Sequence, residues 1–202
     1  MKLRPVSTVE ALADALRTRV LSGDLAPGTS LPEQEISDTY GVARPTVREA
    51  LAALVHEGLL RRERNRSAYV PEITTSDLVD LMYVRGPLEE LMAEALYGHR
   101  VPDAEAALTR LEALPPDEPW AEVVAEHMAF HQALIVAVGS PRLERLYAAL
   151  AAETRLGLVR LRAVYRERAE LVAEHRDLLA AIERGPAEAA RRAVREHLEW
   201  RS

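Results

Sequence analysis

The chain has 202 residues, 48% of them hydrophobic, with no cysteine and a net charge of −6. This length allows one large or two modest domains, each able to bury a core without cross-links. The lack of cysteine excludes disulfides and thiolate metal sites. No apolar run approaches the roughly 18 residues of a membrane span, and no apolar signal segment follows the N-terminus. We therefore expect a soluble, cytoplasmic protein without a membrane partner.

The charge is unevenly distributed. Residues 1–71 hold ten Lys and Arg against nine Asp and Glu, whereas residues 72–202 hold 16 against 23. The overall negative charge argues against a protein that coats nucleic acid through bulk charge. The nearly neutral first part can still bind DNA if its arginines share one face.

Residues 1–71 are predicted to form a winged helix-turn-helix DNA-binding domain. A capping box at Ser7 and Glu10, followed by apolar residues at helical spacing, predicts a helix over 8–22. Helices over 33–40 and 44–57 follow, separated by a tight turn at 41–43. Two short strands, 59–63 and 68–70, around the polar tip 64–67 predict a wing hairpin.

Residues 72–202 are predicted to form an all-helical bundle, which makes the chain mainly α. Prolines stand where first helical turns would begin. Gly86-Pro87 is expected to kink or split the first helix. The predicted helices are 76–98, 103–113, 119–138, 141–164, 166–184 and 186–201.

Polar and basic residues stand at the start of the predicted helix 44–57. The second helix of a helix-turn-helix enters the major groove with its N-terminal residues against base edges. The arginines at the wing tip suit phosphate or minor-groove contacts. The predicted DNA-contacting residues are Gln34, Arg44, Thr46, Arg48, Arg64, Asn65 and Arg66.

The stretch 25–60 resembles the GntR family of bacterial regulators. It matches the family patterns L-x-PG-x-x-L-x-E and VREAL-x-x-L-x-x-EGL. Ala43 stands where the family usually has serine, and Ser67 where the wing usually has glycine. Losing the serine removes a helix-capping oxygen or a phosphate contact, which bears on DNA affinity rather than on the fold.

Four histidines of the second half are candidate metal ligands. His127 and His131 lie four residues apart, so they share one face of a helix, and His175 and His197 stand on two other predicted helices. A bundle interior where three helices meet is a common place for a metal site. The alternative is that these histidines are surface residues or hydrogen-bonded core residues.

The segments around these histidines resemble the FCD ligand-binding domain of the FadR branch of GntR regulators. That domain binds a divalent metal through three histidines and an aspartate, and the resemblance aligns His131, His175 and His197 with the histidines and His127 with the aspartate. Four neutral imidazoles would leave the ion its full charge and favour zinc or nickel. Alternatively, the substitution marks a lost site.

Arg85 is the candidate effector-binding residue. It matches the arginine of the family's E-x-R-x-x-(L/I)-E pattern, which implies that it holds a carboxylate. The alternative is an ion pair between Arg85 and Glu89 on a solvated face.

The resemblance implies a homodimeric transcriptional repressor that binds a palindromic operator and responds to a small organic acid. Two other functions remain open: a metal-free regulator with an apolar effector pocket, and a metal-dependent hydrolase. The hydrolase is less favoured because no glutamate is clearly placed as a base, and we expect no enzyme.

Overall fold

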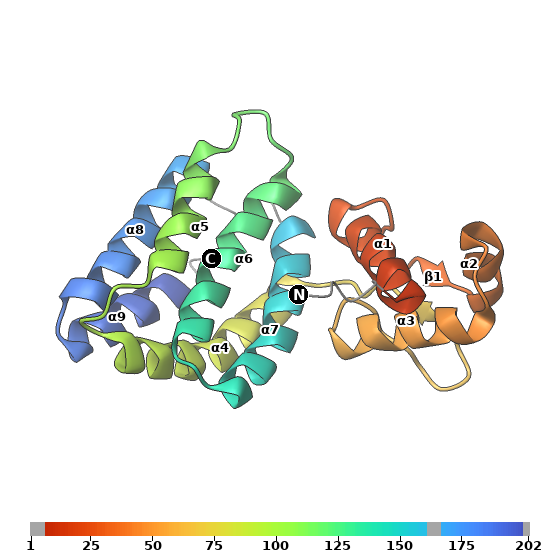
Figure 1. Ribbon diagram of the computed structural model, residues 1–202, viewed down its shortest axis with the longest axis horizontal. Coiled ribbons are helices and arrows are strands. Elements are labelled where there is room, and N and C mark those ends of the chain that lie inside the picture. The colour runs from red at the N-terminus through yellow and green to blue at the C-terminus, as the bar shows by residue number, and fades with distance from the viewer. Residues whose placement is uncertain (1–6, 161–166, 200–202) are drawn as a thin grey trace, which may run out of the picture. The chain divides into compact units, whose positions relative to one another are not determined.

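The chain forms two compact units, Met1–Ile73 and Thr74–Ser202, in a computed structural model that describes residues 7–160 and 167–199 (Figure 1). The helix ends predicted at 164, 166 and 201 lie outside the described residues. Within the described ranges, no helix combines the length and apolar character that crossing a bilayer requires.

The first unit contains three helices, α1 (Thr8–Ser22), α2 (Glu33–Tyr40) and α3 (Arg44–His56). The predicted capping box is present at the start of α1, since the side chains of Ser7 and Glu10 each accept from the other's backbone N–H. Both α1 and α2 pack on α3, whose apolar side is fully buried. The opposite side of α3 is left exposed, as DNA recognition requires.

The wing differs from its prediction. Strand β2 (Ala68–Tyr69) pairs antiparallel with β1 (Ser30–Leu31), a segment for which no strand was predicted. The predicted strand 59–63 is wrong: within it only Arg61 pairs, in an isolated bridge with Tyr69. The physical reason lies at the end of α3, where the N–H groups of residues 59 and 60 donate to the carbonyl of Leu54 and are not available to a β-ladder.

The second unit is a bundle of helices, as predicted. The capping box of Thr74 and Asp77 starts the first of them, which runs through Pro87 as one continuous helix rather than two. Helix α4 packs against α7 and α9, α5 against α6 and α8, and α6 against α7. The described helices are α4 (Thr75–Leu96), α5 (Pro102–Ala113), α6 (Trp120–Ala137), α7 (Pro141–Arg160), α8 (Arg168–Arg184) and α9 (Ala187–Leu198).

Apolar side chains from all six helices form the core of this bundle, and a polar cluster interrupts it. Phe130 and Leu134 of α6 are completely buried, and so is Ile182 of α8. Among the buried residues of the unit, however, are an arginine, a glutamate and three histidines. Because burying polar groups costs free energy unless they are paired, such a cluster within a core indicates a functional site.

Candidate metal centre and DNA interface

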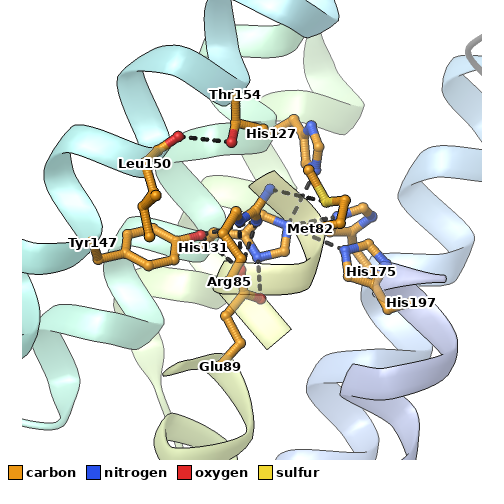
Figure 2. A network of polar contacts seen from close by, with 10 residues as sticks. All are labelled: Met82, Arg85, Glu89, His127, His131, Tyr147, Leu150, Thr154, His175 and His197. Atoms are coloured by element: carbon orange, nitrogen blue, oxygen red, sulfur yellow. Dashed lines mark hydrogen bonds and ion pairs between the residues drawn. The ribbon is translucent and has the colours of Figure 1, made fainter. Parts of the chain in front are cut away.

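Four histidines from three helices meet inside the second unit (Figure 2). His127 and His131 lie one turn apart on α6, His175 comes from α8 and His197 from α9. The first three are buried, and the side chain of His197 is 8% exposed. The structure therefore brings together all four histidines that the sequence singled out.

The ring nitrogens converge on His131. Its Nε2 lies 3.1 Å from Nε2 of His127, 3.2 Å from Nε2 of His175 and 3.3 Å from Nε2 of His197. A tetrahedral zinc ion with Zn–N bonds of about 2.0–2.1 Å separates its ligand nitrogens by about 3.3 Å. All four candidate ligand atoms lie within 4.8 Å of one another. The three distances from His131 match that separation, and any pair 4.8 Å apart would have to move closer when an ion binds.

Two of the four histidines, His131 and His175, have the other ring nitrogen, Nδ1, within hydrogen-bond distance of a protein acceptor. A neutral imidazole that donates through Nδ1 has no proton on Nε2. Nε2 atoms that both carry lone pairs repel one another at about 3 Å unless a cation lies between them, so these tautomers suit metal binding. The pairs are His131 with Glu89 Oε2 at 3.1 Å and His175 with the carbonyl of Leu171 at 2.6 Å. His197 Nδ1 lies 3.3 Å from Glu174 Oε1, which is an ion-pair distance without hydrogen-bond geometry.

A buried ion pair adjoins the histidines. Arg85 and Glu89, one turn apart on α4, are 2% and 0% exposed. Glu89 Oε1 accepts from Arg85 Nε at 2.9 Å, from Arg85 Nη2 at 2.6 Å and from the hydroxyl of Tyr147 at 2.8 Å. The sequence analysis considered this ion pair only as an alternative to effector binding by Arg85, and expected it on a solvated face. The pair exists, but it is buried and touches the histidine cluster through Glu89.

Burial and neighbouring charges determine the protonation states of these side chains. Burial lowers the pKa of His131 to about 4, and it lowers the pKa of His127 and of His175 well below the usual range. Burial alone would raise the pKa of Glu89, but Arg85 and His131 hold it well below its usual value. Near neutral pH these imidazoles are uncharged and Glu89 is ionised, which are the states that ligation and ion pairing require.

An acidic pocket of about 690 Å³ lies between α8 and α9, and His197 forms part of its lining. Four carboxylates line the same pocket. The negative potential attracts cations and repels anions, so this pocket suits the approach of a metal ion better than that of an acid. The lining carboxylates belong to Glu170, Glu174, Asp177 and Glu196.

The exposed start of α3 forms the candidate DNA-reading surface of the first unit. Arg44 and Arg48 have side chains 57% and 60% exposed, and Thr46 between them is half-buried. Ala43 caps the helix without a side-chain hydrogen bond. The two arginines that the sequence predicted to face DNA are thus both in solvent.

Three arginines of this surface lie around one carboxylate. Glu33, at the start of α2, lies 3.1 Å from Arg48 Nη2, 3.6 Å from Arg62 Nη2 and 3.9 Å from Arg44 Nη2. The hydrogen bond from Arg48 is the main reason that the pKa of Glu33 is lowered. Three cations around one anion leave a net positive patch, which is what a phosphate backbone attracts.

The remaining predicted DNA contacts are also exposed. Gln34 donates to Asp38 Oδ1 at 2.9 Å, and Arg66 pairs with Glu63 at 3.1 Å. Asn65, with φ of 61°, adopts the left-handed conformation at the tip of the wing, a conformation that asparagine tolerates better than most residues. Arg64 lies beside it in solvent. Arg64, Asn65 and Arg66 thus form an exposed polar wing tip, whereas Gln34 lies on α2.

The sequence did not identify Glu33, Glu174 or Tyr147, and it assigned no site role to Glu89. A signal existed for Glu89, four residues after Arg85 on one helix face. Nothing in the sequence pattern pointed to Tyr147, because its partners on α4, Glu89 and Arg85, lie 58 and 62 residues earlier in the chain.

Two family models match this chain. Residues 8–70 match the bacterial regulatory proteins of the gntR family, and residues 80–199 match the FCD domain. An HTH-type transcriptional regulator of an unstable DNA locus in Streptomyces ambofaciens is 30% identical over 91% of this chain and 78% of its own length. The gluconate operon transcriptional repressor of Bacillus subtilis is 30% identical over 72% of this chain and 61% of its own length.

A solved structure has the same fold along nearly the whole chain. A GntR transcriptional regulator from Rhodococcus sp. RHA1 aligns with a TM-score of 0.81 and 26% identity, covering 95% of this chain and 93% of that one. A DNA-reading winged helix-turn-helix and a helical ligand-binding domain define the chain as a DNA-binding transcriptional regulator rather than an enzyme. It belongs to the GntR family and carries an FCD domain.

Proposed function

We propose that this regulator is a repressor controlled by a small organic acid that binds at a zinc or nickel ion held by His127, His131, His175 and His197. The observation that carries the proposal is the convergence of the four Nε2 atoms. The Nδ1 hydrogen bonds of His131 and His175 favour tautomers whose Nε2 lone pairs are free to bind a cation. When bound, the ion would supply a Lewis-acidic site for an anion.

A bound divalent ion, rather than the acidic pocket beside His197, would favour an anionic effector. Arg85 and Glu89 neutralise one another, and imidazole is a neutral ligand, so a divalent ion would bring positive charge into a buried cluster that the ligands do not offset. A carboxylate from the effector would offset that charge. Arg85 is the side chain best suited to share it, in competition with Glu89 and Tyr147.

Repression is proposed from the relatives, of which one is named for repressing a gluconate operon. The test begins with selection of an operator from random double-stranded DNA. Operator affinity is then measured by fluorescence anisotropy with zinc-loaded and with chelator-treated protein. Each form is tested with an acid and its neutral analogue: gluconate with sorbitol, and succinate with butanediol. We expect at least one acid, and not its neutral analogue, to change the affinity of the zinc-loaded form alone. If the purified protein binds no stoichiometric amount of metal, the alternative of a metal-free regulator with an apolar effector pocket is favoured.

We further propose that the regulator is a homodimer formed through the outer face of α4, which would present two DNA-binding domains to a palindromic operator. That face carries Val79, Tyr83, Val84 and Leu91, with exposed fractions of 47%, 79%, 43% and 55%. Leu146 on the neighbouring α7 is 62% exposed. Such a run of apolar side chains along one helix is typical of a protein interface.

The dimer is tested with the paired substitution Tyr83→Glu and Leu91→Glu. We expect the particle mass from light scattering to fall from that of a dimer to that of a monomer, because two charges would be buried in each half of the interface. Val136→Glu, at a 46% exposed position on α6, is the matched control and should remain dimeric. A wild-type monomer, or a paired variant that still dimerises, contradicts the proposal.

A further inference from the structure

We propose that Glu89 is a positioning residue for the metal: it holds His131 so that Nε2 of that ring points into the histidine cluster. The proposal rests on the metal site proposed above, and it assigns a role to a residue that is not itself a ligand. Figure 2 shows the carboxylate of Glu89 in contact with both the guanidinium of Arg85 and the ring of His131.

His131 is the ligand whose orientation matters most. Its Nε2 lies within 3.3 Å of Nε2 of each of the other three histidines. A rotation of this one ring would therefore disturb three ligand-to-ligand distances at once. The contact that resists such a rotation is made on the opposite side of the ring, where Nδ1 lies 3.1 Å from Glu89 Oε2.

Glu89 is well placed to resist that rotation because its other oxygen is held firmly. Oε1 accepts two hydrogen bonds from Arg85, at 2.6 and 2.9 Å, and one from Tyr147 at 2.8 Å. Both residues of the ion pair are at most 2% exposed, so water does not compete for the carboxylate. A fixed carboxylate behind an imidazole also strengthens the donor nitrogen on the far side of the ring.

The contact differs in kind from those behind the other ligands. His175 is backed by the carbonyl of Leu171, which is neutral, and His197 by Glu174, whose side chain is 24% exposed. Glu89 is the fully buried carboxylate among these acceptors. Because a charged acceptor in a dry environment binds more strongly than a neutral or a solvated one, Glu89 should contribute most to metal affinity.

The experiment separates positioning from fold stability. Glu89→Gln alone would leave the charge of Arg85 buried without its partner, so it is studied beside the paired variant Arg85→Met with Glu89→Gln, in which that charge is also removed. Zinc affinity is measured by competition with a chromophoric chelator, and helical content of the metal-free proteins by circular dichroism. Glu126→Gln, a half-buried glutamate of α6 that pairs with Arg110, is the matched control.

We expect zinc affinity to fall about 10- to 100-fold in both Glu89 variants and to stay unchanged in Glu126→Gln. The visible absorption of the cobalt-loaded protein should also change in the paired variant, because a neutral amide would replace the carboxylate behind the His131 ring. If the paired variant regains wild-type affinity and cobalt absorption, Glu89 serves only the ion pair and the proposal is overturned. If the wild-type protein itself binds no zinc, the failure lies with the proposed metal site instead.

Discussion

Replacing His131 by asparagine is expected to lower zinc affinity at least about 100-fold, the largest effect of any single change in the second unit. Loss of an outer-shell partner alone costs about 10- to 100-fold, and His131 is both a candidate ligand and the ring on which the other three nitrogens converge. Asparagine keeps a polar group in the buried position and can still contact Glu89. The measurement is zinc titration against a competing chelator.

Thermal unfolding gives a second measurement of the same change. A ligand present at 100 times its Kd stabilises the folded state by about 2.7 kcal/mol, so zinc should raise the Tm of the wild-type protein by several degrees. In His131→Asn the rise should disappear. His99→Asn, at an exposed histidine after α4, should keep both the affinity and the rise. Wild-type zinc affinity in His131→Asn would mean that the histidines do not bind metal together.

Most helices, and the pairing of His127 with His131, were predictable from local signals. Capping boxes at Ser7 and Thr74 and prolines at helix starts mark where helices begin, and these signals act within one turn of the chain. His127 and His131 share a face by their spacing alone. Placing His175 and His197 beside them required the family resemblance, because spacing within one helix says nothing about contacts between helices.

What the sequence could not predict depends on pairing across long distances. Strand β1 has two residues, too few to show an alternating pattern, and its partner lies about 38 residues further along the chain. The ion pair of Arg85 and Glu89 was foreseen at the correct spacing but in the wrong environment. Their burial depends on packing of α4 against other helices, including α7, whose Tyr147 contacts both residues.

Replacing Arg48 by alanine is expected to reduce the preference for the selected operator over a scrambled sequence by about 5- to 150-fold, which is what one guanidinium-to-guanine contact contributes. Arg48 lies at the exposed start of α3, where its guanidinium is held 3.1 Å from Glu33. Nε and Nη2 of Arg48 both contact the Glu33 carboxylate, so this fork would exchange a carboxylate for a guanine if the start of α3 enters the major groove. The measurement is fluorescence anisotropy on both DNA sequences at fixed salt concentration.

Two further arginine variants distinguish base reading from general attraction to phosphate. Arg48→Lys keeps the charge but not the fork, so it should lose operator preference while retaining affinity for scrambled DNA. Arg66→Ala, at the wing, should weaken binding to both sequences equally and lower the salt slope by about 1. Arg142→Ala, at an exposed arginine of α7, is the control and should change neither. If Arg48→Lys keeps the full operator preference, Arg48 contacts phosphate, and base reading must be assigned to Arg44 or Thr46.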